Sequence, residues 1–304
     1  MLELTNLHKR FGDVVALEGC NLRACPGRMV GFLGPNGSGK TTAMRSIFGL
    51  IHLDAGTASW HSQPISNDEH RRFGYMPEQR GLYPRMRVRD QIVYFARLHG
   101  RDAAEASQAA DHWLDRLGLA DRASSRLEEL SHGNQQRVQL IVAIAHEADL
   151  LVLDEPFAGL DPIGVESLGE VVREQAARGA AVLFSSHQLD LVEDLCDDVT
   201  IIHRGRTVLE GALAEVRAAS PSRYVHASVD SNSDRPWHEA IEGTELLWSR
   251  NDERRLRVPV DADPAALLAA AQAAGTVTFF RFEPPLLSDL FMEAVNDQSE
   301  DLAP

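Results

Sequence analysis

The first 60 residues contain short apolar runs, some alternating with polar residues, between turn-forming residues, which is the pattern of β-strands. Leu2–Leu4 and Val14–Leu17 are two such runs. Met29–Leu33 is an apolar run that predicts a buried strand, and Thr42–Phe48 after it predicts the start of a helix. The N-terminal part is therefore expected to be rich in strands, with a helix inserted among them.

A helical period replaces this pattern between about Val88 and His146. Gly100 and Gly118 interrupt the period and mark helix ends. The predicted helices of this segment are Val88–Leu98, Ala103–Leu117 and Gln135–His146.

Strands and helices alternate after this segment, which indicates a sheet containing parallel strands with helices on its faces. The helical segment, at about residues 85–146, is then an insertion into an α/β core. The predicted strands are Leu150–Leu153, Val182–Phe184 and a hairpin of Val199–His203 with Thr207–Leu209, and the predicted helices are Ile163–Ala177 and Leu189–Leu195.

The small, polar stretch Ala218–Ser222 contains a proline and predicts a linker. We therefore expect an α/β domain over residues 1–218 and a small α+β accessory domain over residues 223–304. The strands predicted for the second domain are Tyr224–Val229, Glu245–Trp248, Arg254–Val260 and Thr276–Phe282, and its helices are Pro264–Ala274 and Leu286–Val295.

Composition narrows the classes of partner and compartment. The formal net charge of −15 argues against a protein that binds nucleic acid by neutralising phosphates. Cys20, Cys25 and Cys196 form no zinc pattern and predict reduced thiols in a cytosolic protein. The N-terminus lacks the apolar core of a signal peptide, and no apolar stretch approaches the roughly 18 residues of a membrane span. We therefore expect a cytoplasmic protein whose membrane role depends on a partner chain.

The loop between the run Met29–Leu33 and the helix after it fits the phosphate-binding pattern G-x-x-x-x-G-K-[ST]. Glycines that take φ > 0 turn the backbone N–H groups inward into an anion nest, at which the helix N-terminus also points. Lys40 would contact the β- and γ-phosphates, and Thr41 would bind Mg²⁺. The alternative is a glycine-rich turn without a ligand. The predicted nucleotide-binding residues of the loop are Gly34, Pro35, Asn36, Gly37, Ser38, Gly39, Lys40, Thr41 and Thr42.

A second element for phosphate chemistry ends the apolar run Leu150–Leu153. Such a run is typical of a central parallel strand, whose C-terminal end opens at the ligand edge of the sheet. Asp154 would bind Mg²⁺ directly or through water, and Glu155 would polarise a water for in-line attack on the γ-phosphate. An apolar strand ending in two carboxylates is common by itself, and it gains this meaning from the phosphate loop upstream.

With these motifs in this order, the chain resembles the ATP-binding subunit of an ABC transporter over about Met1–Leu213. The resemblance implies a P-loop NTPase fold of the ABC type, with a mixed sheet and an inserted helical subdomain. The further motifs that carry it are the signature-like Leu130–Val138, the partner-contacting loop Gly159–Pro162, the switch-histidine segment Ser185–His187, the glutamine loop Tyr75–Gln79 and the aromatic Phe11.

The resemblance also implies roles for single residues. Phe11 would stack on adenine, and Ser131 with Gly133 would contact the γ-phosphate held by a partner subunit. Gln79 would sense Mg²⁺ and the attacking water, and His187 would hold that water with Glu155. Taken alone, Phe11 fits a packing residue, Gln79 a surface residue and His187 a helix cap. The family's signature differs here at two positions, where His132 replaces a glycine and Asn134 a glutamine.

By this resemblance the chain hydrolyses ATP with Mg²⁺, pairs head to tail with a second ATPase subunit around two ATP molecules, and powers a separate membrane permease from the cytoplasmic face. The run Pro285–Phe291 resembles the accessory region of subunits that serve export-type permeases. A soluble ABC-type ATPase acting on ribosomes or DNA is disfavoured by the single cassette and the acidic charge. A regulatory binder that has lost hydrolysis is disfavoured by the intact Lys40, Asp154, Glu155 and His187.

Overall fold

A computed structural model describes residues 1–79, 81–231, 237–240 and 242–300. The chain divides into two compact units, one built mainly of Met1–Ala212 and the other of Leu213–Asn296. Each unit has its own hydrophobic core. The division lies before helix α8 (Leu213–Ala219), so the stretch in which a linker was predicted lies within the second unit. Only Ser220 and Pro221 of that stretch lie outside regular elements.

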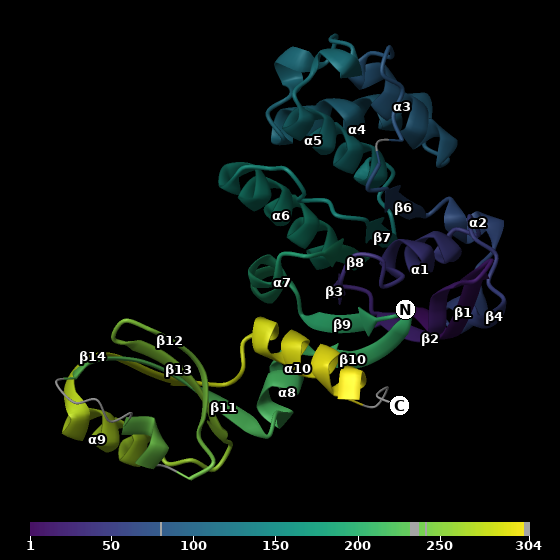
Figure 1. Cartoon of the computed structure of the whole chain (residues 1–304). Coiled ribbons are helices and arrows are strands. Elements are labelled where there is room, and N and C mark those ends of the chain that lie inside the picture. Colours follow the sequence, from purple (N-terminus) through teal and green to yellow (C-terminus); the bar gives the residue numbers. More distant parts are fainter. Residues whose placement is uncertain (80, 232–236, 241, 301–304) are drawn as a thin grey trace. The chain divides into compact units, whose positions relative to one another are not determined.

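The first unit is built around a six-stranded sheet (Figure 1). Its strands from β9 to β6 in spatial order run parallel, while β10 pairs antiparallel with β9 as the predicted hairpin. The strands β3 and β7 have the predicted bounds, and both are fully buried. In spatial order the sheet contains β10 (Arg206–Ala212), β9 (Asp198–His203), β3 (Met29–Leu33), β8 (Ala181–Ser186), β7 (Leu150–Leu153) and β6 (Phe73–Met76).

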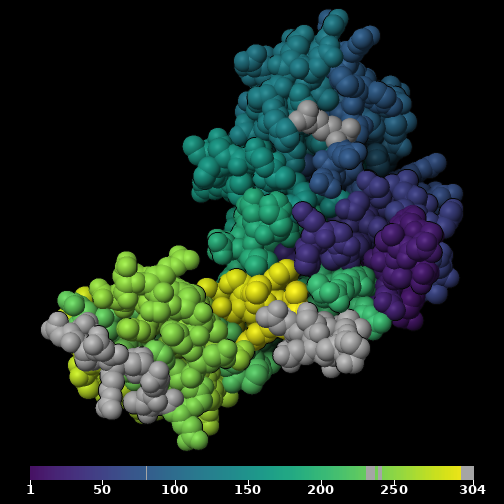
Figure 2. All heavy atoms as spheres, viewed as in Figure 1, coloured from purple at the N-terminus to yellow at the C-terminus, as the bar shows by residue number. Residues whose placement is uncertain are grey.

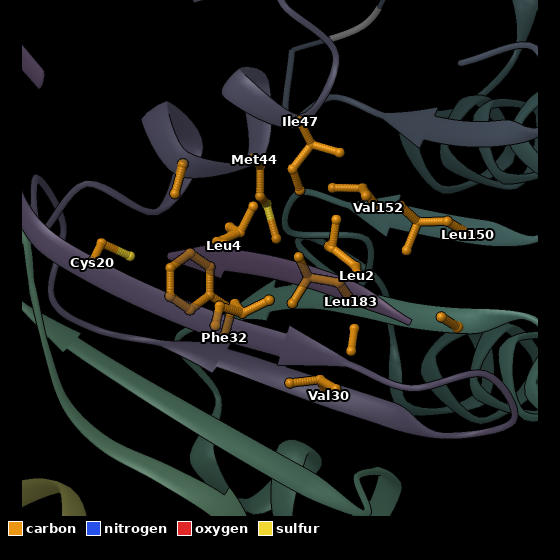
Figure 3. Close-up of a cluster of buried hydrophobic side chains, with 14 of the residues drawn as sticks. Leu2, Leu4, Cys20, Val30, Phe32, Met44, Ile47, Leu150, Val152 and Leu183 are labelled. Carbon is orange, nitrogen blue, oxygen red and sulfur yellow. The ribbon is translucent and has the colours of Figure 1, made fainter. Parts of the chain in front are cut away.

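A second, antiparallel sheet of the same unit shares a hydrophobic core with helix α1 (Lys40–Ile47). Figure 3 shows Met44 and Ile47 of this helix pointing into a cluster that includes Leu2, Leu4 and Phe32. Burying one such side chain contributes about 1.5–3 kcal/mol, so the cluster fixes the helix that begins at the phosphate loop. The strands of this sheet are, in spatial order, β2 (Val14–Ala24), β1 (Leu2–Phe11), β4 (Ala55–Trp60) and β5 (Gln63–Pro64).

The predicted helical insertion forms a block whose atoms pack into a continuous lobe, blue to teal in Figure 2. Helix α5 begins at His132, earlier than predicted, because the Ser131 hydroxyl accepts the Asn134 N–H at 3.4 Å and caps the helix there. It also ends earlier, at Ile144. The block contains α3 (Val88–Leu98), α4 (Ala103–Arg116), α5 (His132–Ile144) and the short 3₁₀ helices Ala120–Arg122 and Leu127–Glu129.

The remaining helices of the first unit lie between strands. The Asp161 carboxylate accepts the Gly164 N–H at 2.7 Å and Pro162 occupies the first turn, so the sequence sets the start of α6. No helix of the described residues is both long and apolar enough to cross a membrane. These helices are α2 (Asn67–His70), α6 (Pro162–Ala177) and α7 (Leu189–Leu195).

The second unit combines helices with an antiparallel sheet, and it begins and ends earlier than the accessory domain expected over residues 223–304. Its antiparallel sheet contains, in spatial order, β12 (Glu245–Arg250), β13 (Glu253–Pro259), β11 (Ser222–Ser231) and β14 (Gly275–Glu283). Apolar side chains of β11 and β13 pack against Leu267 and Ala271 of helix α9. Its helices are α8, the 3₁₀ helix Trp237–Ala240, α9 (Pro264–Ala274) and residues 287–296 of α10 (Leu287–Glu300).

Candidate nucleotide-binding and catalytic site

The predicted phosphate loop connects β3 to α1, as strand, loop and helix in immediate succession. Gly37 and Gly39 take positive φ angles of 78° and 109°, which a side chain would disfavour. At Gly39 a Cβ would also run into the Ala16 carbonyl oxygen. The Gly205 N–H of the β9–β10 turn donates to the Ser38 carbonyl at 2.9 Å and braces the loop from behind.

Lys40 lies at the centre of this loop. Its ammonium donates to the carbonyl oxygens of Gly34 at 2.7 Å and Pro35 at 3.2 Å, so the loop curls around the side chain. Burial lowers the pKa of Lys40, and the nearby carboxylates of Glu155, Asp154 and Glu78 offset only part of that effect. The carboxylates therefore do not fully compensate the burial of the charged ammonium, and the phosphates of a nucleotide would supply further negative charge.

A cavity of about 370 Å³ opens over the loop. It brings together the phosphate loop and both carboxylates that follow β7, although these lie far apart in the sequence. The residues lining it are Val14, Val15, Ala16, Asn36, Gly37, Ser38, Gly39, Lys40, Thr41, Thr42, Glu78, Asp154 and Glu155.

Asp154 is buried, with 1% of its surface exposed, at the end of β7. Its Oδ1 accepts a hydrogen bond of 2.7 Å from the Ser185 hydroxyl. Its Oδ2 is buried and has no hydrogen-bond partner among the described residues. Thr41 brings a hydroxyl oxygen to the same cavity. Carboxylate and hydroxyl oxygens are the donors that Mg²⁺ prefers, so two such residues lining one cavity fit the ion.

Glu155 and His187, two predicted catalytic residues, lie next to each other in the structure. The His187 Nδ1 lies 3.0 Å from the Glu155 Oε2. Glu155 has a φ of 51°, a left-handed conformation that is uncommon outside glycine and is often found at functional sites. The Gln136 side-chain amide donates to the Glu155 and Pro156 carbonyl oxygens at 3.3 and 2.9 Å. A side chain of α5 thus fixes the turn that follows β7.

Other predicted residues lie outside the lining of this cavity. Phe11 is half exposed at the end of β1, with the Lys9 ammonium 5.3 Å from its ring centre. Gln79 is exposed and does not line the cavity, whereas its neighbour Glu78 does. Gly34 and Pro35 contribute through their carbonyl bonds to Lys40.

The signature-like residues Ser131 and Gly133 lie at the start of α5, also outside the lining of the cavity. The His132 ring lies beside Gly159, where an added Cβ would be 3.4 Å from its Cε1 atom. The substituted residue of the signature therefore packs toward the loop that follows Glu155 in the same chain.

Sequence reasoning missed three residues of the site, namely Ser185, Gln136 and Glu78. The signal for Ser185 was a hydroxyl at the end of an otherwise apolar strand, directly before Ser186 and His187. The signal for Gln136 was a polar side chain on the buried side of a helix, which requires a hydrogen-bond partner.

Comparison with known proteins agrees with this geometry. A family model described as ABC transporter matches residues 17–158. The ABC transporter ATP-binding protein YhaQ of Bacillus subtilis is 40% identical over 296 residues, covering 97% of this chain and 98% of that protein. Nod factor export ATP-binding protein I of Burkholderia lata is 37% identical over 214 residues, covering 69% of this chain and 70% of that protein.

Solved structures show the same fold. An ATP-binding subunit of an ABC transporter superposes with a TM-score of 0.67 at 32% identity, covering 72% of this chain and 92% of that chain. A dimeric bacterial ABC transporter cassette superposes with a TM-score of 0.64 at 23% identity, covering 70% of this chain and 99% of that chain. The chain therefore belongs to the ATP-binding proteins of the ABC transporter family and contains that family's ATPase domain.

Proposed function

We propose that this chain binds Mg-ATP between two ATPase subunits and hydrolyses it to power a separate membrane permease, in the direction of export. The observation that carries the proposal is the convergence of Lys40, Asp154 and Glu155 on one cavity, with His187 bonded to Glu155. Phosphoryl transfer requires mainly positioning and charge neutralisation, and this set of residues is sufficient for both.

Each residue then has a separate task. The loop N–H groups and the Lys40 ammonium hold the β- and γ-phosphates. Thr41 and the free Oδ2 of Asp154 would hold a magnesium ion, which would neutralise charge on the phosphate oxygens. Glu155 orients the water for attack on the γ-phosphate and accepts its proton, while His187 fixes the Glu155 carboxylate through the 3.0 Å bond.

The position of the signature supports a pair of subunits. Ser131 and Gly133 do not line the cavity of their own chain, so their N–H groups and hydroxyl are available to the nucleotide of another copy. A two-fold pair would place each signature over the other subunit's ATP. A cassette with the same fold has been solved as a dimer.

An apolar groove supports a membrane partner. A cavity of about 420 Å³ lies between the sheet and the helical block, lined by aromatic and aliphatic residues that include Phe48, Tyr75, Leu82 and Phe95. Leu50, at the same groove, is 63% exposed. The groove is also lined by Pro77 of the predicted glutamine loop and by Gly81, which follows that loop, so a permease segment bound there would contact the chain beside Glu78 and Gln79. The relatives named for Nod factor export support export as the direction of transport.

The decisive experiment is the Glu155→Gln variant. The change removes the proton acceptor and keeps the size of the side chain, so we expect hydrolysis to fall at least about 100-fold while Mg-ATP stays bound. ATP that cannot be split should hold the pair together, which light scattering measures as a doubling of mass upon addition of Mg-ATP.

The matched control is Glu210→Gln, on an exposed residue of β10, which should hydrolyse ATP like the wild type. A wild-type chain without ATPase activity in the presence of its permease would refute the proposal. So would a Glu155→Gln chain that still releases phosphate at the wild-type rate.

A further inference from the structure

Ser185 is the next-to-last residue of β8. Its side chain is fully buried, and β8 is the direct neighbour of β7 in the sheet. Its hydroxyl oxygen lies 2.7 Å from the Asp154 Oδ1 and 2.9 Å from the Glu155 backbone nitrogen. One buried hydroxyl thus contacts both residues of the carboxylate pair.

The chemistry of the groups fixes the direction of both bonds. The Glu155 N–H is only a donor, so the Ser185 oxygen accepts from it. An ionised carboxylate is only an acceptor, so the single hydroxyl hydrogen goes to the Asp154 Oδ1. Serine has one such hydrogen, and the two bonds use the hydroxyl as donor and as acceptor at once.

The hydrogen bond from Ser185 to Asp154 distinguishes the two oxygens of the Asp154 carboxylate. Oδ1 is occupied by the serine, while Oδ2 is buried without a hydrogen-bond partner among the described residues. The carboxylate can no longer rotate without losing a buried charge-assisted hydrogen bond. Oδ2 is therefore the oxygen left to bind a metal ion in the cavity that Thr41 also lines.

The hydrogen bond from the Glu155 N–H to the Ser185 oxygen holds the backbone of Glu155. This residue takes the left-handed φ of 51°, which a non-glycine residue keeps only where its surroundings hold it. The Ser185 oxygen holds its N–H, and the Gln136 amide holds its carbonyl oxygen at 3.3 Å. The direction in which the Glu155 side chain leaves the turn follows from this conformation.

We propose that Ser185 is a positioning residue, which presents Oδ2 of Asp154 to the metal ion and sets the direction of Glu155. The inference rests on the proposed function of this site. It assigns Ser185 no contact with nucleotide, water or metal, so its removal should change metal binding and turnover while leaving metal-free nucleotide binding intact.

The test compares Ser185→Ala with Ser185→Thr, which retains the hydroxyl. Mn²⁺ serves as the metal probe, and its affinity for the protein–ATP complex is measured by electron paramagnetic resonance. We expect Ser185→Ala to weaken Mn²⁺ binding about 10-fold and to lower kcat about 10- to 100-fold, as loss of a residue that orients a metal ligand typically does. The affinity for ATP in the presence of EDTA should change less than about two-fold. The KM for Mg-ATP should rise by up to about the same 10-fold as the loss of Mn²⁺ affinity, because metal and nucleotide binding form one thermodynamic cycle. Ser185→Thr should restore most of these losses.

The matched control is Thr200→Val on the nearby strand β9, which removes a buried hydroxyl that has no hydrogen-bond partner among the described residues. It should bind Mn²⁺ and turn over like the wild type. If Ser185→Ala does not fold, as a thermal scan would show, Ser185→Cys supplies a weaker donor and should give intermediate losses. The inference is overturned if Ser185→Ala, or Ser185→Cys in its place, binds Mn²⁺ like the wild type. A wild-type chain that binds Mn-ATP but never hydrolyses it would instead refute the proposed function.

Discussion

At the scale of single residues, the described chain buries polar side chains mainly where bonds or a ligand compensate them. Lys40 and Asp154 are both buried, and each has a hydrogen-bond partner, Lys40 within its own loop and Asp154 on the neighbouring strand β8. His146 is a different case, because it is buried outside the cavity and stacks on His99 with 3.9 Å between the ring centres. Burial, with the charges of His99 and Arg101, lowers the pKa of His146 to about 3.

This burial predicts a loss of stability in mild acid. An exposed histidine titrates near about 6.5, so between pH 6.5 and 3 the unfolded chain binds a proton at His146 that the folded chain does not bind. The free energy of unfolding should therefore fall as the pH falls through this window and stay level above it. From this group alone the loss between pH 7.5 and 5.5 is about 1.4 kcal/mol.

Urea unfolding of the wild type and of His146→Leu at the two pH values measures this difference. The variant should lose about 1.4 kcal/mol less than the wild type over the same step. The control His52→Leu, on an exposed histidine, should behave like the wild type. Equal pH dependence of the wild type and His146→Leu would contradict the assignment.

At the scale of elements, helix α5 connects three functional loops through buried glutamines. Gln135 donates to the Leu130 carbonyl at 2.8 Å, Gln136 to Pro156 at 2.9 Å and Gln139 to Pro77 at 2.6 Å. Leu130 is the first residue of the signature-like segment, Pro156 follows Glu155, and Pro77 lies in the glutamine loop. One helix therefore sets the relative positions of the three loops.

We expect Gln139→Leu to destabilise the first unit by about 1–3 kcal/mol, because it leaves the Pro77 carbonyl without its buried donor. Gln91 on the neighbouring α3 provides the matched comparison. It is fully buried, and neither its amide nitrogen nor its oxygen has a hydrogen-bond partner among the described residues. Gln91→Leu should therefore be neutral or stabilising. Chemical denaturation of both variants decides, and a larger loss for Gln91→Leu would reverse the interpretation.

The sequence was informative about elements and less so about their neighbours. The strands β3 and β7 and the helices α3 and α9 have the predicted bounds, because their apolar period or glycine and proline boundaries are local signals. The start of α5 was predicted late, since His132, Gly133 and Asn134 give no apolar period. The bond between Ser185 and Asp154 depends on β8 lying beside β7, which no local pattern of residues specifies.

At the scale of the whole molecule, the two units have separate cores. The first contains Phe32, Met44 and Leu183, and the second contains Val225, Leu256 and Leu267. The residues of the candidate site all lie in the first unit. A ligand of this site should therefore stabilise one unit only.

Scanning calorimetry should resolve two transitions of the intact chain. Mg-ATP at 100 times its Kd should add about 2.7 kcal/mol to the stability of the first unit and leave the other transition in place. Leu267→Ala, at a fully buried position of α9, should lower the other transition by about 2–5 kcal/mol. The exposed Leu247→Ala should lower neither. A single transition that Mg-ATP and Leu267→Ala both move would show that the units unfold together.

The three glutamine bonds of α5 have a consequence for an assembled pair. The end of this helix that begins at His132 faces the neighbour's nucleotide in the proposed arrangement, and its buried side anchors the turn of its own Glu155. In the proposed pair, a displacement at the His132 end of this thirteen-residue helix would also move the Gln136 amide that holds the turn of Glu155. Binding at one half of the pair would thus be communicated to the chemistry of the opposite half, which is an allosteric coupling built from amide hydrogen bonds.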